Sequence, residues 1–388
     1  MAGALEDLLV LDLTSHLSGP YAAMMLGDHG AEILKIEPPG SGDSARGMPP
    51  FVNGESAPFM IWNRNKRSIL LDLKQPEDLA RMLALVDRAD ILIENFRPGV
   101  MDRLGLGYEV LHARNPRLIY GSISGFGQTG PYRERGGFDL MTQGMSGLMS
   151  TNGPEDGPPH RLPIAISDVS AGMFLAFGLL AAVAARHRTG LGQQVETSLL
   201  ESATALGLYE AAHYFATGTR PPRIGQMHRG SAPYRVFATS DGFITIGAAQ
   251  QKFFVLLCTL IGAPELATDP RFARNADRVA NNAALVALIQ DRLTSRTSAE
   301  WLFTLEAAGI PAGPVLHYDE VFTDPQILAR EMVVETDHPV TGKFRTLGVN
   351  VKLSDTPGSV RRPAPRLGEH TEEVLAEVLG RPVGEAAK

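Results

Sequence analysis

The sequence predicts an α/β protein that has a large domain built on a doubly wound parallel sheet and a smaller α+β domain. Three observations lead to this class. Short apolar runs rich in β-branched residues alternate with helical segments over the first 125 residues. An apolar run over 171–185 then predicts a buried helix, and a hairpin signal follows a linker rich in Pro and Gly. Strands that alternate with helices are typical of βαβ units, in which helices cover both faces of a parallel sheet.

The first part of the chain supplies the predicted sheet. A helix over 20–28 begins through Gly19 and Pro20, because Pro is favoured at the first position of a helix. A second helix over 76–86 has its apolar residues at helical spacing, so one face is expected to be buried. Strands are expected over the apolar runs 8–14, 31–37, 67–73, 89–95 and 118–124.

The rest of the chain predicts a second domain and a return segment. The hairpin signal is Ser240-Asp241-Gly242 between two apolar runs, and it follows the linker at 217–223. We expect residues 1–216 to form the N-terminal part of the large domain, 226–330 the small domain, and 331–388 a segment that completes the large domain. Further strands are expected over 194–198, 234–239, 243–246 and 347–353, and further helices over 199–215, 252–261, 281–293 and 369–379.

The bulk composition argues against several classes of protein. The chain has 388 residues and a net charge of −7, and it lacks the Lys/Arg cluster that nucleic-acid binding needs. Its single cysteine, Cys258, excludes an intramolecular disulfide and is consistent with a reducing compartment. The acidic N-terminus and an apolar run shorter than the roughly 18 to 20 residues of a membrane span predict a cytoplasmic protein without a membrane segment. Neither H-E-x-x-H nor paired cysteines occur, so no metal is expected.

Asp168 is the most informative single residue, because it lies directly before the apolar run 171–185. There Ser167 or Asp168 would be the N-cap, whose side-chain oxygen accepts free backbone N–H groups of the first turn. A carboxylate held against a core helix can also act as a nucleophile toward an activated acyl group. The residues alone leave both interpretations open, with capping the commoner role of such an aspartate.

Loops that follow the predicted strands carry the other candidate groups. Arg97 and Arg103 follow the fourth strand, where a parallel sheet binds its ligands, and Arg grips phosphate by bidentate hydrogen bonds. A solvated charge cluster is the alternative. His16, in the first strand-to-helix loop, is the histidine most favourably placed to face a ligand. A G-x-G-x-x-G match over 125–130 is weak evidence for a dinucleotide, because Pro131 follows it where a helix should begin.

Taken together, these segments resemble the family III CoA-transferases, the group of the carnitine, bile-acid and formyl-CoA:oxalate CoA-transferases. Each motif is short, but their order and spacing agree with the family over nearly the whole chain. The matching segments are 10–14, 18–22, 35–39, 63–68, 94–99, 125–127, 145–149, 308–315 and 368–372.

The resemblance implies that Asp168 is the nucleophile of a covalent CoA transfer from an acyl-CoA, such as succinyl-CoA, to a carboxylic acid. The intermediates would be an aspartyl anhydride and an aspartyl-CoA thioester. CoA would bind as a substrate along residues 1–216, with no permanently bound cofactor, and Asp139 would lie near the active site. The implied contacts to CoA are His16, Leu17, Asn65, Lys66, Arg67, Arg97 and Arg103.

Two alternatives belong with this interpretation. Racemases of the same family use a His/Asp pair, with the His in a Gly-His-Asp segment, but here that segment is Gly137-Phe138-Asp139. Because a phenylalanine carries no proton, two-base racemisation is disfavoured. The other alternative is an inactive homologue that only binds acyl-CoA.

The chain departs from some family members in two respects. Pro38 stands where some members have an Arg that contacts CoA. The polyglycine run of oxalate-using members is absent, which disfavours oxalate and formyl-CoA as substrates. The resemblance also implies an interlocked homodimer, in which two ring-like chains thread through each other.

Overall fold

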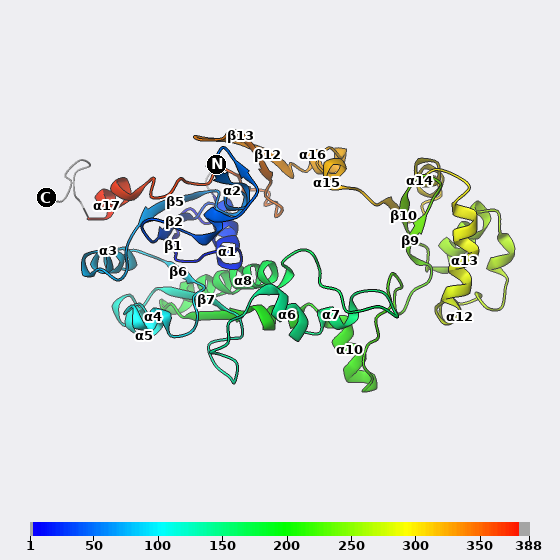
Figure 1. Cartoon of the computed structure of the whole chain (residues 1–388), viewed down its shortest axis with the longest axis horizontal. Helices are drawn as coiled ribbons and strands as arrows, with labels where there is room; N and C mark the ends of the chain where they lie inside the picture. The colour runs from blue at the N-terminus through cyan, green and yellow to red at the C-terminus, as the bar shows by residue number, and fades with distance from the viewer. Residues whose placement is uncertain (1–2, 380–388) are drawn as a thin grey trace. The chain divides into compact units, whose positions relative to one another are not determined.

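The computed structural model describes residues 3–379, which form two compact units. The first unit joins residues up to 149 with 161–218 and those from 325 onward, and the second joins 150–160 with 219–324. The course of the chain can be followed by its colour in Figure 1.

A six-stranded parallel sheet organises the first unit and confirms the predicted α/β class. Its order is β5-β2-β1-β6-β7-β8, so the direction of winding reverses between β1 and β6. Open sheets of this order bind ligands at that reversal, outside the carboxyl ends of the strands. The strands are β1 (Leu9–Asp12), β2 (Glu32–Glu37), β5 (Lys66–Leu70), β6 (Ile91–Glu94), β7 (Ile119–Ser124) and β8 (Gln194–Ser198).

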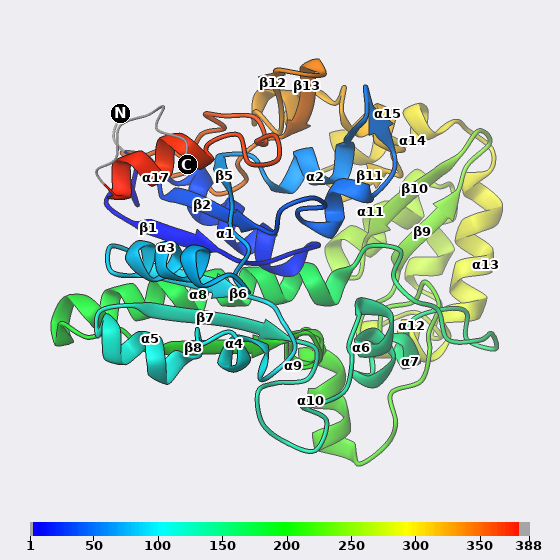
Figure 2. The same ribbon diagram turned by 60° about the vertical axis from the view of Figure 1, so that its left-hand side comes forward.

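Helices bury both faces of this sheet, as Figure 2 shows. Successive residues of β1 serve opposite faces, because Val10 joins one hydrophobic cluster and Leu11 joins the other. The first cluster includes residues of α1 (Ser18–Asp28), α8 (Ile166–Thr189) and α9 (Leu199–Ala205). The second includes residues of α3 (Pro76–Val86), α4 (Val100–Arg103), α5 (Tyr108–Arg114) and α17 (Thr371–Leu379).

Helix α8 is the central helix of the first face, where it packs against α1, α9, β7 and β8. A Cβ added at Gly172 would lie 2.6 Å from the carbonyl oxygen of Ser18, so only glycine permits this close approach of α8 to α1. By length and composition α8 is the one helix among the described residues that could cross a membrane, but half of its apolar window is buried. A core helix has these same properties.

The last part of the chain also belongs to the first unit. The Arg67 side chain, at β5, donates hydrogen bonds to Glu373 and Glu377 of α17. The Asn65 side-chain oxygen accepts the backbone N–H groups of Arg361 and Arg362 at 2.7 and 3.0 Å. The remaining elements of the unit are η1 (Ser44–Gly47), β3 (Phe51–Val52), β4 (Glu55–Ser56), α2 (Ala57–Trp62), α6 (Asp139–Met145), α10 (Leu208–Thr217), α16 (Pro325–Ala329), β12 (Val333–His338) and β13 (Gly342–Leu347); α7 (Leu148–Thr151) spans the boundary.

The second unit is a small antiparallel sheet with helices. Strands β9 (Tyr234–Ala238) and β10 (Phe243–Gly247) form the predicted hairpin, and β11 (Ala312–Pro314) pairs with β10. Its core includes Phe237, Phe254 and Trp301. The helices are α11 (Gln251–Leu260), η2 (Pro264–Ala267), α12 (Asn275–Ala280), α13 (Asn282–Leu293), α14 (Ser298–Ala307) and α15 (Tyr318–Val321).

Two expectations about secondary structure were wrong. The helix predicted over 199–215 is two helices, α9 and α10, separated at Leu206 and Gly207. The strand predicted over 347–353 lies earlier, because β13 ends at Leu347 and pairs antiparallel with β12. Residues 348–353 alternate apolar and other side chains but have no strand partner.

Candidate active site

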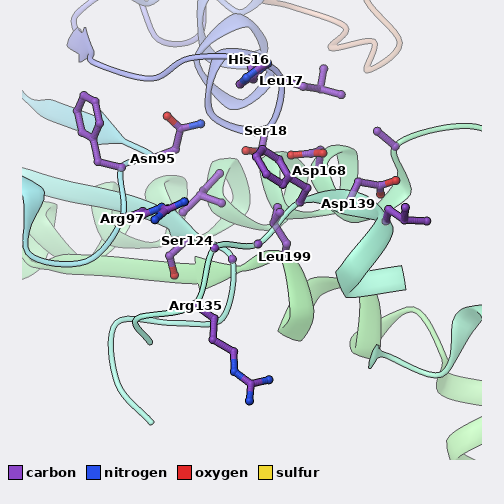
Figure 3. A pocket seen from close by; sticks show the side chains of 18 of the residues that line it. His16, Leu17, Ser18, Asn95, Arg97, Ser124, Arg135, Asp139, Asp168 and Leu199 are labelled. Atoms are coloured by element: carbon purple, nitrogen blue, oxygen red, sulfur yellow. The ribbon is translucent and has the colours of Figure 1, made fainter. Parts of the chain in front are cut away.

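A cavity of about 410 Å³ lies at the carboxyl ends of β1, β6, β7 and β8, next to the first turn of α8. It therefore occupies the position at which the strand order reverses. Figure 3 shows the side chains that surround it. The polar or charged lining includes His16, Ser18, Asn95, Arg97, Ser124, Arg135, Asp139 and Asp168.

Asp168 lies in the first turn of α8 and lines this cavity. The N-cap prediction was wrong for both Ser167 and Asp168, because the helix already begins at Ile166 and Ala165 is the N-cap. The Asp168 carboxylate is therefore not used to cap its own helix. The positive end of the helix dipole still lies next to it, which favours the negative charge that a nucleophile needs.

The pKa of Asp168 is raised to about 6. Burial of the carboxyl group is the main cause and the nearby charge of Asp139 adds to it, while a hydrogen bond with Ser18 acts in the opposite direction. At neutral pH the group is therefore ionised but more basic than an ordinary aspartate. Such a carboxylate is suited to attack an acyl carbon.

The segment that leads into α1 and carries Ser18 is held through its backbone. Lys35 Nζ donates to the Thr14 carbonyl oxygen at 2.8 Å, and Lys66 Nζ donates to the Pro20 carbonyl oxygen at 2.9 Å. The side chain of Asn95 pairs with Ser15, since its Oδ1 accepts the Ser15 N–H at 2.9 Å and its Nδ2 donates to the Ser15 carbonyl at 2.8 Å. These contacts fix the backbone on both sides of the cavity-lining residues 16–18.

The two lysines belong to a buried cluster of charges at the end of β1, within β2 and at the start of β5. Asp12 is fully buried, and its Oδ2 lies 2.8 Å from Lys66 Nζ and 3.8 Å from Lys35 Nζ. Lys35 also pairs with Asp43 at 2.8 Å. Burial alone would raise the pKa of Asp12, but the two ammonium groups lower it to about 2. For Lys66, burial outweighs the attraction of Asp12 and lowers the pKa to about 8.

The structure brings together some of the residues that the resemblance assigned to CoA, but not all. His16, Leu17 and Arg97 line the cavity, as do Phe138 and Asp139. Arg103 is exposed on α4, and the lining of the cavity does not include it.

Three other assigned residues lie away from the cavity. Lys66 belongs to the charge cluster, and Arg67 bonds to the acidic side chains of α17. Asn65 Nδ2 donates to Asp28 at 2.8 Å and to the Ser359 carbonyl at 2.9 Å. Most of their polar atoms thus bond within the protein in this structure, although Nε of Arg67 is buried without a hydrogen-bond partner.

Several lining residues were not assigned from the sequence. Asn95 belongs to the matching segment 94–99 and Ser18 to the matching segment 18–22, so the sequence held a signal for both. Trp62, at the end of α2, directly precedes the matching segment 63–68, but an apolar residue at this position carries no signal of its own for a site. Among residues 3–379, no group of three or more His, Cys, Asp or Glu side chains is arranged to hold a metal ion.

Comparisons with known proteins agree on one family. The sequence model described as "CoA-transferase family III" matches residues 5–371. A succinyl-CoA:glutarate CoA-transferase of Mus musculus is 40% identical over 376 residues, which cover 97% of this chain and 86% of the relative. An acetyl-CoA:oxalate CoA-transferase of Acetobacter aceti is 44% identical over 95% of this chain and 94% of its own. A solved CAIB/BAIF family protein from Brucella suis superposes with a TM-score of 0.89 at 38% identity, covering 97% of this chain and 100% of that one.

Proposed function

Since this chain belongs to CoA-transferase family III and is a CoA-transferase, we propose that it moves CoA from succinyl-CoA to a carboxylic acid through a covalent intermediate on Asp168. One observation carries the proposal: the half-buried, basic carboxylate of Asp168 lines the cavity at the reversal of the sheet. Succinyl-CoA is the donor in the name of the mouse relative, whereas the Acetobacter aceti relative is named for acetyl-CoA and oxalate.

In the proposed reaction the carboxylate of Asp168 forms an anhydride with the donor acyl group and then a thioester with CoA. An oxygen of Asp168 attacks the thioester carbon, the carbon–sulfur bond breaks, and CoA thiolate leaves an acyl-aspartyl anhydride. The thiolate then attacks the Asp168 carbonyl carbon, which releases the donor acid and forms an aspartyl-CoA thioester. The acceptor carboxylate reverses both steps and restores Asp168. The positive end of α8 and the Ser18 hydroxyl lie next to Asp168, where they would stabilise the negative charge that each tetrahedral intermediate develops on oxygen.

Arg97 is the cation that we propose for the phosphates of CoA. It follows β6, lines the cavity, and is exposed, so its guanidinium is available for bidentate contact with phosphate. We further propose that His16 and Leu17 lie against the pantetheine end, because the loop 14–18 borders both the cavity and Asp168.

The proposal is tested by acyl exchange and by trapping. The protein is incubated with succinyl-CoA or acetyl-CoA and a set of acceptors that includes glutarate and oxalate, and new thioesters are separated by chromatography. Hydroxylamine or borohydride trapping followed by peptide mapping locates the adduct. A modified Asp168 peptide together with a new acyl-CoA supports the proposal. Exchange of the α-proton in deuterated water without any adduct would replace it by racemisation.

Racemisation has less support in the geometry of the cavity. Phe138 lines the cavity and its side chain is 62% exposed, so an apolar ring occupies the place in the motif where the racemases have histidine. An aromatic hydrocarbon neither accepts nor donates the α-proton. Transfer needs no such group, since the carboxylate alone forms the intermediates.

We predict that activity decreases at low pH as Asp168 takes up a proton; this decrease is the acid limb of the pH profile. Only its ionised form attacks, so kcat/KM should fall about tenfold for each pH unit below about 6. Ser18→Ala removes the hydrogen bond that lowers this pKa, and the limb should move to higher pH with a severalfold lower rate at neutral pH. Ser15→Ala is the matched control, because that hydroxyl pairs with Ser44 instead. Equal limbs in all three proteins would contradict the role of Ser18.

We also propose a homodimer, in accordance with the family. Four apolar residues at helical spacing lie on one face of α8 and are exposed in the single chain, with Phe177 at 74%. Such a face is unusual on a monomer and is typical of an interface. They are Met173, Phe174, Phe177 and Leu180.

Phe177→Glu is expected to weaken this dimer, because it places a charge in the middle of an apolar contact. Sedimentation velocity or light scattering should show the wild type at twice the chain mass and the variant shifted toward the monomer. Val110→Glu, at an exposed apolar position on α5, should leave the mass unchanged. A monomeric wild-type protein would contradict the proposal.

A further inference from the structure

The carboxylate of Asp139 is bound by the protein on both of its oxygens. Its Oδ1 accepts the backbone N–H of Ser167 at 3.0 Å, and its Oδ2 accepts Nε2 of Gln143 at 2.8 Å. The N-cap of α8, Ala165, offers no side-chain oxygen. Asp139 therefore caps α8 from a different helix, α6, and does so one residue before Asp168.

Gln143 is the residue that fixes this arrangement. Its side chain is fully buried. Besides Asp139, it contacts the segment that leads into α8: its Oε1 accepts the Leu162 N–H at 2.9 Å, and Nε2 lies 3.3 Å from the carbonyl oxygens of Leu162 and Ile164. A buried amide whose donors and acceptor are all used is expensive to replace.

From these contacts we infer that Gln143 is a positioning residue of the transfer reaction, which acts on Asp168 through Asp139. The amide holds the Asp139 carboxylate against the first turn of α8, and so fixes how far its negative charge lies from the nucleophile. This inference rests on the nucleophilic role proposed for Asp168. The inference also changes the expectation for Asp139. Both of its carboxylate oxygens already accept hydrogen bonds from the protein, so they are not free to bind a substrate.

The electrostatic setting indicates what loss of Gln143 should do. The other titratable or charged side chains that line the cavity are His16, Arg97 and Arg135. Burial is the main cause of the raised pKa of Asp168, and the charge of Asp139 adds to it. Without the amide, the Asp139 carboxylate loses a contact that holds it against α8 and turns away, which reduces its repulsion on Asp168. The nucleophile then becomes less basic and its helical turn less fixed.

The test uses Gln143→Met, which keeps the length of the side chain but removes its hydrogen bonds. We expect kcat to fall about tenfold with little change in the KM for acyl-CoA, and the acid limb to move to lower pH. Gln290→Met is the matched control, because Gln290 braces α13 to β9 through two contacts with Ala238, at 2.9 and 2.7 Å, in the other unit. Gln290→Met should be less stable than the wild type, but its acid limb should lie at the same pH.

Gln143→Glu provides a second, nearly isosteric variant in case the first one folds poorly. Two carboxyl groups at this separation share one proton, which can replace the amide donor. The variant should be active while that proton is held and lose activity above its pKa, giving an alkaline limb that the wild type lacks.

The readout is the rate of Asp168 labelling by the acyl donor against pH, measured by quenched-flow mass spectrometry. If Gln143→Met labels at the wild-type rate with an unmoved limb, and Gln143→Glu gains no alkaline limb, the inference is overturned while the proposed function stands. A wild-type protein that is never labelled at Asp168 would instead overturn the proposed function.

Discussion

Asp168→Ala is expected to lower kcat by about 10⁴-fold or more, because removal of a covalent nucleophile leaves only binding to promote the reaction. The same substitution should make the protein more stable at neutral pH. The folded-state pKa of about 6 lies above the ordinary 3.8, so ionisation of Asp168 favours the unfolded chain. This penalty is absent below pH 4, grows between pH 4 and 6, and is complete above pH 6. Its removal is worth about 1–3 kcal/mol.

Both effects are measured on one preparation, by succinyl-CoA turnover and by urea unfolding at pH 5 and pH 7.5. Asp87→Ala is the control, because that aspartate forms an exposed ion pair with Arg114, and neither residue lines the cavity. It should leave activity unchanged and change stability by less than about 1 kcal/mol. Retained turnover in Asp168→Ala would exclude the covalent mechanism, and lower stability at pH 7.5 would show that its carboxylate is not strained by burial.

Asp12→Asn is expected to cause the largest loss of stability of any single polar substitution that we propose. It leaves Lys35 and Lys66 fully buried without the carboxylate they share, and loss of one partner from a buried pair costs about 3–5 kcal/mol. Urea unfolding at pH 7 measures this loss. Activity should fall with it, because Lys66 and Lys35 also hold the backbone at Pro20 and Thr14.

The pH dependence of stability gives a second check on Asp12. Its folded-state pKa of about 2 lies below the ordinary 3.8, so its stabilising contribution is present above pH 4 and is lost as the pH falls toward 2. In this range the difference between wild type and Asp12→Asn should shrink. If the free energies of unfolding of the wild type and Asp12→Asn differ by less than about 1 kcal/mol at pH 7, the remaining buried charges compensate one another without Asp12.

Local patterns predicted most of the elements around the sheet. The helix expected over 76–86 is α3 with the same ends, and the strand expected over 194–198 is β8, because Pro and turn residues mark these limits. The strand expected over 347–353 fails for a non-local reason. Alternating side chains satisfy the pattern, but a strand also needs a neighbour, and β12 pairs with the segment before it.

Only some residues of the site could be predicted, because sequence patterns do not show which distant residues pair. Asp168 stands out because its neighbours in sequence form the helix behind it. Lys66 has the same chemistry whether it faces a phosphate or a buried carboxylate, and its partner Asp12 lies 54 residues away on another strand. The cap that Asp139 gives to α8 spans 28 residues and two helices. Only the folded chain shows such pairings, so motifs cannot reveal them.

The division of the first unit also sets an order of events during translation. Its sheet comes from early residues, yet Arg67 and Asn65 find their partners in segments beyond residue 358. Residues 219–324, which belong to the second unit, emerge from the ribosome before those segments do. Domains fold as units once their residues have emerged. The edge of the nascent first unit at β5 therefore stays incomplete until the segments with Ser359, Arg361 and Glu377 have emerged and bind to it.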